Sequence, residues 1–331
     1  MRIARTFVLG VALATLPVMT LGCGDKPPPA APKREAQPAW QDVFDGTPEI
    51  YVVVRPQLMK HDAVYGNFFS VLMRVARARS GLSSTTLEAL DGCDEFVFGV
   101  SKREGADDAV FVVRGVPASM DAQKLTDGSG HSLFRLVDSR AKVPELESLD
   151  RRTVGGGALF VLPDRTWVVT AGDARARARQ AFASPFGRPA PKADPEALAS
   201  IRVDASVLAR RGVGPNLAVL TKKLTALSLV LEKGKGGLVI ALQYADEDAT
   251  AWAEMQVKRI IAERASADPA AAPPPPAGPR RPTTAPQGPA RLDWLKEAVV
   301  TREGNSVRVR VPVPARLLEE LPGVTGGDVA W

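Results

Sequence analysis

Short apolar runs, broken by glycine, proline or charged residues, recur along much of the chain and predict β-strands. The run Tyr51–Arg55 is rich in β-branched residues and stops at Pro56, and a similar run covers Ser200–Asp204. Runs separated by a few turn-forming residues predict hairpins, because a short turn brings consecutive strands into antiparallel pairing. The predicted hairpins join residues 95–101 to 109–115, 157–162 to 166–171, 226–232 to 238–244, and 298–302 to 307–313.

Apolar residues three or four positions apart predict helices between these strands. The clearest helix covers Glu247–Ala265, where acidic residues at the start and Arg264 near the end suit the helix dipole. We interpret its apolar stripe as facing the core; the stripe consists of Trp252, Ala253, Val257, Ile260 and Ile261. The other expected helices cover residues 66–79, 216–224 and, capped by Asp173, 173–183, with short ones after Ser119 and Pro314.

The order of these elements repeats along the chain, which suggests an internal duplication. The hairpin of residues 157–171 overlays that of residues 298–313 at one constant offset, so that the turn Pro163–Asp164 falls on Gly304–Asn305. Two chance α+β stretches are the alternative. The sequence therefore predicts an α+β fold of two related halves, each an antiparallel or mixed sheet with helices on one face.

Changes in composition divide the 331 residues into segments. A Pro/Ala-rich insertion at residues 267–290 is expected to be disordered, because proline lacks a backbone donor and fixes φ. The expected organisation is a signal peptide at 1–22, an anchor and Pro-rich tether at 23–47, a first α+β repeat at 48–190, a second repeat containing the insertion at 198–322, and a tail at 323–331.

The N-terminus has the pattern of an export signal. Arg2 and Arg5 form a basic start, and the apolar stretch Phe7–Met19 follows. This stretch is shorter than the roughly 20 residues of a membrane span. The sequence therefore predicts a signal peptide that is removed during export.

The next residues, Thr20-Leu21-Gly22-Cys23, resemble the lipobox of bacterial lipoproteins. The resemblance implies cleavage before Cys23 and attachment of lipid to that cysteine, although Thr20 and Leu21 depart from the usual leucine followed by alanine or serine. An ordinary signal peptide with an incidental cysteine is the alternative. The polar, Pro-rich stretch that follows suits a tether holding a domain away from the bilayer. In some bacteria, an aspartate directly after the lipidated cysteine retains the lipoprotein at the inner membrane. This chain has Gly24 there, which favours the outer membrane.

The composition, with 45% apolar and 24% charged residues, is that of an ordinary globular protein. The formal charge of +6 is too small to indicate a nucleic-acid partner. Abundant alanine, proline and arginine are typical of a high-GC bacterium such as a myxobacterium. With two cysteines and two histidines, the chain has neither a disulfide framework nor a His-rich metal site, and we expect no metal or cofactor.

Two candidate motifs for chemistry have stronger structural interpretations. Cys93 lies among the carboxylates of residues 91, 94 and 95, which should raise its thiol pKa and make it a poor nucleophile. The stretch around His131 has the composition of a turn, as does Gly234–Gly237, which is followed by a strand rather than by the helix of a phosphate loop.

Three arginines on the helix after Asp173 form a candidate anion-binding patch. Arg175 and Arg179 share a helix face, whereas Arg177 points elsewhere. A solvated helix face is the alternative.

These observations favour a non-catalytic lipoprotein of the cell envelope, anchored through Cys23 and facing the periplasm, that binds a partner protein or an envelope polymer. One alternative is a periplasmic hydrolase with a carboxylate site that the sequence does not locate. Another is a protein that binds anionic lipid or lipopolysaccharide through the arginines. Two facing carboxylates in a pocket would favour the first alternative, and an arginine-lined cavity the second.

Overall fold

The computed structural model describes residues 37–313, apart from residues 45, 68, 71–72, 74–81, 104–105, 139–141, 150–156, 186–193, 195, 212–217, 235 and 267–292. The expected signal peptide and Cys23 lie outside the described residues, as do the Pro/Ala-rich insertion, the helix after Pro314 and most of the helix at 66–79.

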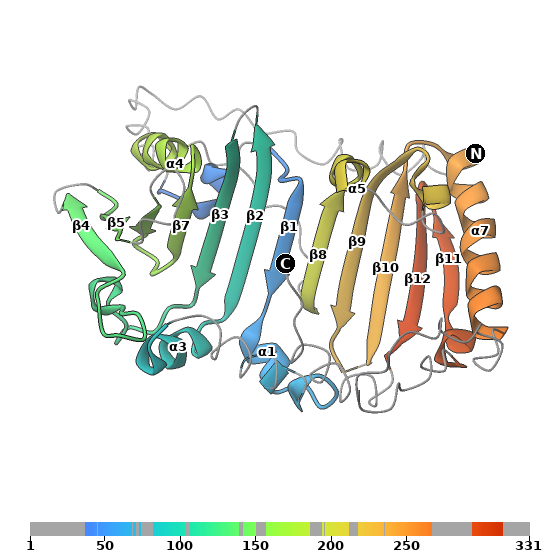
Figure 1. Ribbon diagram of the computed structural model, residues 1–331, viewed down its shortest axis with the longest axis horizontal. Helices are drawn as coiled ribbons and strands as arrows, with labels where there is room; N and C mark the ends of the chain where they lie inside the picture. The colour runs from blue at the N-terminus through green and yellow to red at the C-terminus, as the bar shows by residue number, and fades with distance from the viewer. Residues whose placement is uncertain are drawn as a thin grey trace, which may run out of the picture. The chain divides into compact units, whose positions relative to one another are not determined.

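The described part of the chain contains twelve strands. They are β1 (Ile50–Val54), β2 (Glu95–Arg103), β3 (Ala106–Arg114), β4 (Phe134–Asp138), β5 (Glu145–Ser148), β6 (Ala158–Val161), β7 (Trp167–Ala171), β8 (Ala197–Asp204), β9 (Leu224–Glu232), β10 (Gly237–Tyr244), β11 (Val299–Glu303) and β12 (Ser306–Pro312). All pair antiparallel in one sheet of order β11-β12-β10-β9-β8-β1-β2-β3-β7-β6-β5-β4 (Figure 1).

Short helices connect the strands, and two longer helices pack at opposite ends of the sheet (Figure 1). The α-helices are α1 (Pro56–Lys60), α3 (Ser84–Asp91), α4 (Ala174–Ala183), α5 (Ala205–Arg211) and α7 (Glu247–Ser266). The 3-10 helices are η1 (Trp40–Val43), η2 (Ala122–Lys124), η3 (Val219–Thr221) and η5 (Asp293–Glu297). Within the described ranges, no helix combines the length and apolar character of a membrane span.

The register gives the sheet two distinct faces. Val53 pairs with Val97, which pairs with Val112, which pairs with Val168. These four side chains share a face, and we call it the α4 face because Ala174, Ala178 and Phe182 of α4 pack against it. The opposite side, which we call the α7 face, carries Val307, Val309 and Val311 against Ala253 and Val257 of α7.

The core on the α4 face is built around β1, β2, β3 and β7. Trp40 and Phe44 from the N-terminal segment cover Tyr51 and Val53, and the rings of Trp40 and Phe44 pack edge-to-face at 6.0 Å between centroids. In the same core, the ring centroids of Phe160 on β6 and Phe182 on α4 lie 5.3 Å apart. Burying several aromatic and branched residues in this way is the main source of stability in this layer.

The α7 face carries a small core near the sheet centre, where Met59, Tyr65 and Phe69 pack against Val54, Ala199 and Leu231, and two larger cores. One lies under α7 and contains Leu220, Leu224, Leu242 and the β12 valines. The other lies over β3, β7, β6 and β5, where Val116, Ala122 and Leu125 cover Leu159 and Trp167. The α7 face is therefore covered at both ends of the sheet, and the α4 face is covered around β1, β2, β3 and β7.

The four hairpins predicted from the sequence are confirmed, with boundaries shifted by a few residues at most. The long helix is also confirmed as α7, and its predicted stripe holds only in part: Ala253 and Val257 are buried, whereas Trp252 is 36% exposed. Asp173 makes no side-chain cap, because it already has helical backbone angles.

Other expectations are wrong. The expected helix at 216–224 is wrong over its last part, because Val219–Thr221 form the 3-10 helix η3 and Leu224 already begins β9; residues 216–217 lie outside the described residues. The expectation of helices on one face fails in the first half, where α4 and α3 pack on opposite faces, because the central strands are apolar on both sides. The sequence patterns did not indicate β5, α1, α3 or α5.

Candidate functional site

Helix α7 is held against the sheet by a defined start and an apolar face. The Asp246 carboxylate accepts a hydrogen bond from the Ala249 backbone N–H at 2.8 Å, which caps the first turn. Ala253 and Val257 then face the strands, while Ile260 and Ile261 are partly buried beside them.

The turn around η3 closes one end of this layer. Tyr244 is 2% exposed and donates a hydrogen bond from its hydroxyl to the Leu220 carbonyl at 2.9 Å. Burial raises the pKa of this hydroxyl to about 12, so it stays protonated as a donor. The bond ties the end of β10 to η3.

Between α7 and the sheet lies a cavity of about 350 Å³, which we call the α7 cavity. Its lining side chains come from α5, η3, β9, β10, α7, η5 and β12. They are Leu208, Leu220, Thr221, Leu224, Leu227, Leu229, Ile240, Leu242, Val257, Ile260, Ile261, Leu295, Val309 and Val311. Only Thr221 among them carries a polar side-chain atom, so the α7 cavity is a site for an apolar group.

This lining has a direct chemical consequence. General acid–base and nucleophilic catalysis need a titratable or activated side chain within hydrogen-bond reach of the reacting group. No carboxylate, imidazole, thiol or amine lines the α7 cavity. Its geometry is suited to binding.

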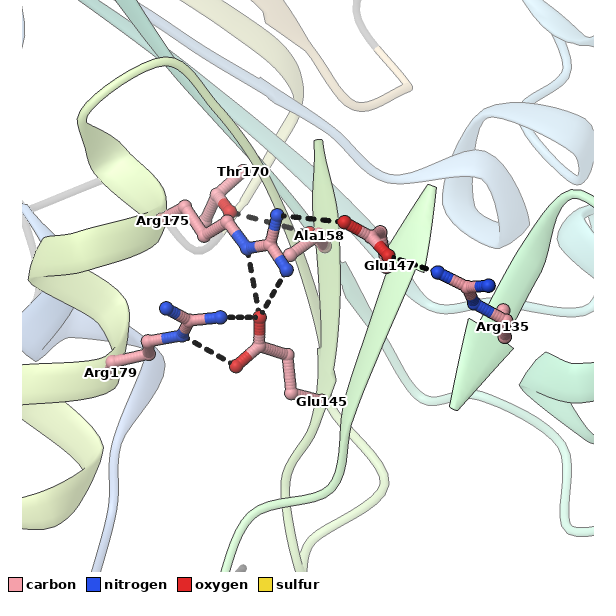
Figure 2. Close-up of polar contacts among 7 residues, drawn as sticks. All are labelled: Arg135, Glu145, Glu147, Ala158, Thr170, Arg175 and Arg179. Carbon is pink, nitrogen blue, oxygen red and sulfur yellow. Dashed lines mark hydrogen bonds and ion pairs between the residues drawn. The ribbon is translucent and has the colours of Figure 1, made fainter. Parts of the chain in front are cut away.

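The predicted arginine patch lies at the other end of the sheet, on the α4 face (Figure 2). Arg175 and Arg179 both contact the Glu145 carboxylate of β5, at 2.8 Å and 2.7 Å. Glu147 lies 3.5 Å from Arg175 and 2.8 Å from Arg135. Figure 2 shows these five side chains as one alternating row of charges, which we call the ion-pair chain.

Arg177 points away from the ion-pair chain, as the helical spacing predicted. Its guanidinium pairs with Asp108, which is only 1% exposed, and donates to the Val43 carbonyl at 3.4 Å. Arg177 therefore joins α4 to β3 and to the N-terminal 3-10 turn. Each of the three arginines already has a carboxylate partner, which gives the patch a structural role and leaves anion binding a prediction.

The arginines also set the ionisation of the two glutamates. Burial opposes ionisation of Glu145, but the hydrogen bonds and charges of Arg179 and Arg175 outweigh burial and lower the pKa of that carboxyl. Hydrogen bonds from Arg135 and Arg175 lower the pKa of Glu147 in the same way.

A second cavity, of about 410 Å³, lies beside the ion-pair chain. It is lined by Lys142, Val143, Glu145, Phe160, Arg179, Phe182 and Ala183. Glu145 is the one carboxylate in this lining, and it is engaged by two arginines. The linings of these two cavities, among the described residues, contain no pair of facing carboxylates of the kind expected of a hydrolase.

The other candidate residues have the roles that the sequence favoured. Cys93 is fully buried, and burial together with Asp94 and Asp91 raises its thiol pKa to about 12. His131 lies in an exposed turn where its ring contacts Asp127 at 3.3 Å. In the ranges that the structure describes, no group of three or more histidines, cysteines or carboxylates is arranged to hold a metal.

No known protein family matches the sequence, and no curated protein is significantly similar to it. Among solved structures, crystal form III of TP0453 matches with a TM-score of 0.47 at 10% identity, over 88% of this chain and 100% of that chain. Crystal form IV matches with a TM-score of 0.46 at 9% identity, over 85% of this chain and 96% of that chain. A likeness this distant carries no argument about function, which must come from the chain's own residues.

The sequence did not reveal the α7 cavity. Leu227, Leu229 and Leu231 alternate along β9 and indicate an apolar strand face. Alternation does not tell whether that face packs tightly or leaves space, because the space depends on how α7 and η3 sit above it.

Proposed function

We propose that this protein is a lipid-anchored, non-catalytic binding protein of the cell envelope, whose ligand places an apolar group in the α7 cavity. The observation that carries this proposal is the lining of that cavity, in which thirteen of the fourteen side chains are apolar. A space of this size surrounded by hydrocarbon excludes polar ligands and favours apolar ones.

The anchoring part of the proposal rests on the N-terminal sequence. Gly22 and Cys23 follow an apolar segment of signal-peptide length, and the Pro-rich stretch after them suits a tether. We propose that lipid on Cys23 holds the protein on the periplasmic side of an envelope membrane, with the outer membrane favoured. The cavity would then be close to a source of hydrocarbon chains.

We also propose that the two halves of the chain are duplicated. Starting from the sheet centre, the strand order is β1-β2-β3-β7-β6 in one direction and β8-β9-β10-β12-β11 in the other. The two orders correspond strand for strand, and β1 pairs antiparallel with β8 between them. This correspondence supports an axis of approximate twofold symmetry between β1 and β8.

The other functions considered receive less support. A hydrolase lacks its carboxylate pair in the described cavities. Recognition of anionic lipid or lipopolysaccharide by Arg175, Arg177 and Arg179 would require displacing Glu145, Glu147 or Asp108 from them. A protein or polymer partner stays a prediction.

The experiment is a binding assay on the mature chain with Cys23→Ala, which removes the lipid that would otherwise compete. The neutral dye N-phenyl-1-naphthylamine should fluoresce on binding, and decanoic acid should displace it. Ile240→Trp should weaken binding at least tenfold by filling the cavity, whereas Val137→Trp, at a position 48% exposed on β4, should not. Equal binding by the two variants would refute the α7 cavity as the site.

A further inference from the structure

One unbroken apolar row crosses the α7 face of the sheet. The pairing register places one residue from each strand directly beside the next, and all twelve are apolar. From β11 to β4 they are Val300, Val309, Ile240, Leu229, Ile201, Val52, Phe98, Phe111, Val169, Leu159, Leu146 and Leu136. We call this set the cross-sheet row.

The two ends of the cross-sheet row are covered, whereas Ile201 and Phe98 at its centre stay partly exposed beside the small core of Met59, Tyr65 and Phe69. Val309 at one end is 5% exposed, and Leu159 near the other end is fully buried. Ile201 and Phe98, on either side of Val52, are each 37% exposed. Large apolar side chains exposed together in one line indicate a binding surface more often than isolated ones do.

The exposed centre of the row adjoins the lining of the α7 cavity. Leu229 lines the cavity and also belongs to the row, and its neighbour across the strand pair is Ile201. Leu229 and Phe98 are three strand spacings apart, which is about 14 Å at about 4.8 Å per strand. An apolar track of this length therefore leads out of the cavity over β8, β1 and β2.

The chemistry of the track indicates which kind of ligand can bind along it. Its side chains offer no hydrogen-bond donor or acceptor, and the backbone groups beneath them are paired within the sheet. A peptide or a polysaccharide laid along it would leave its own polar groups without partners, which is costly. A hydrocarbon chain has no such groups, and its linear shape suits a path along this row, whose neighbours on the same face are apolar as well.

We propose that the ligand is a long acyl chain that fills the α7 cavity, leaves it at Leu229 and continues across the sheet over Ile201, Val52 and Phe98. This inference rests on the proposed function and defines its ligand class. A chain short enough to fit the cavity uses only the first part of the site, and a longer chain uses both parts.

The test is the dependence of affinity on chain length in the Cys23→Ala protein, from decanoic to hexadecanoic acid. Burying each further methylene should tighten binding by about fourfold while the track has room. Ile201→Ser should leave decanoic acid binding unchanged but weaken hexadecanoic acid binding at least tenfold. Val137→Ser, at an exposed apolar position on β4, should change neither.

A second measurement avoids reliance on a polar substitution. Phe98→Trp keeps the row apolar and adds a fluorophore at the far end of the track. A stearic acid that carries a nitroxide near its methyl end should quench this tryptophan more strongly than one with the nitroxide near its carboxylate. Val137→Trp should show no difference between the two probes.

The outcomes separate the two proposals. Failure of decanoic acid to bind the unsubstituted Cys23→Ala protein would refute the proposed function. Normal decanoic acid binding with no gain for longer chains, and no quenching at Phe98→Trp, would overturn the track while leaving the cavity. Concentration-dependent dimerisation that Ile201→Ser abolishes, without any effect of chain length, would assign the exposed centre of the row to a second copy and also overturn the track.

Discussion

Glu145 is the centre of the ion-pair chain, and replacing it with glutamine tests how far that chain stabilises the fold. The Glu145 side chain is 10% exposed and contacts Arg175, 18% exposed, and Arg179, 53% exposed. Glu145→Gln keeps the volume and removes the charge, so that Arg175 loses its closest counter-ion.

The magnitude follows from the exposure of the partners. Removing one member of a fully buried ion pair costs about 3–5 kcal/mol. Here the cost is smaller, because Arg179 can turn into water and Arg175 keeps Glu147 at 3.5 Å. We therefore expect Glu145→Gln to lower the free energy of unfolding by about 2 kcal/mol at neutral pH.

The loss should depend on pH in a definite direction. The pKa of Glu145 is lowered in the folded protein from its ordinary value of 4.5. As the pH falls through 4.5, the unfolded chain takes up this proton first, so the stabilisation declines until the folded carboxyl is also protonated. The difference in stability between the unsubstituted protein and Glu145→Gln should therefore narrow in this range.

The assay is urea-induced unfolding of both proteins at neutral pH and at several values below 4.5, with Arg135→Ala as the matched control. Arg135 is at the outer end of the same ion-pair chain and is 69% exposed, so its removal should cost much less. If Glu145→Gln cost no more than Arg135→Ala, or if its effect were independent of pH, the structural role assigned to the chain would be refuted.

Three further predictions concern other parts of the protein. Mass spectrometry of the mature N-terminus should find lipid on Cys23, and Cys23→Ala should leave precursor or release soluble protein; an unmodified N-terminus elsewhere would contradict the anchor. Deleting residues 267–290 should change the melting temperature little, because a Pro/Ala-rich segment of this kind cannot build a packed core; a large drop would show that the segment packs on the fold. The Cys93 thiol, with a pKa of about 12, should react with a thiol reagent only after unfolding, and rapid labelling of the native protein would contradict its burial.

The elements that the sequence predicted well are those determined by local pattern. Apolar alternation on both sides of a short polar turn is enough to define the hairpin of β9 and β10, because neighbouring residues alone fix the pairing. Helix α7 was found because its apolar positions recur at helical spacing over many residues. The separation of Arg177 from Arg175 and Arg179 was likewise visible from helix geometry.

Short elements were predicted wrongly or missed where the local sequence has only a weak preference for one structure. Residues 216–224 have apolar spacing compatible with a helix, yet Leu224 is used in β9, because pairing with β10 outweighs one more helical turn. The four-residue strand β5 carries two charged residues and was missed, although those residues, Glu145 and Glu147, accept the arginines of α4.

The sequence by itself determined the hairpins, the long helix and the apolar faces of the strands, because these depend on residues a few positions apart. Only the tertiary structure decided that β1 pairs with β8, that α4 and α7 cover opposite faces, and that the arginines of α4 meet Glu145 and Asp108. The α7 cavity and the cross-sheet row belong to this second group. Both arise from contacts between residues distant in the sequence, and the space left between packed elements is a property of their arrangement, which no single segment of the chain encodes.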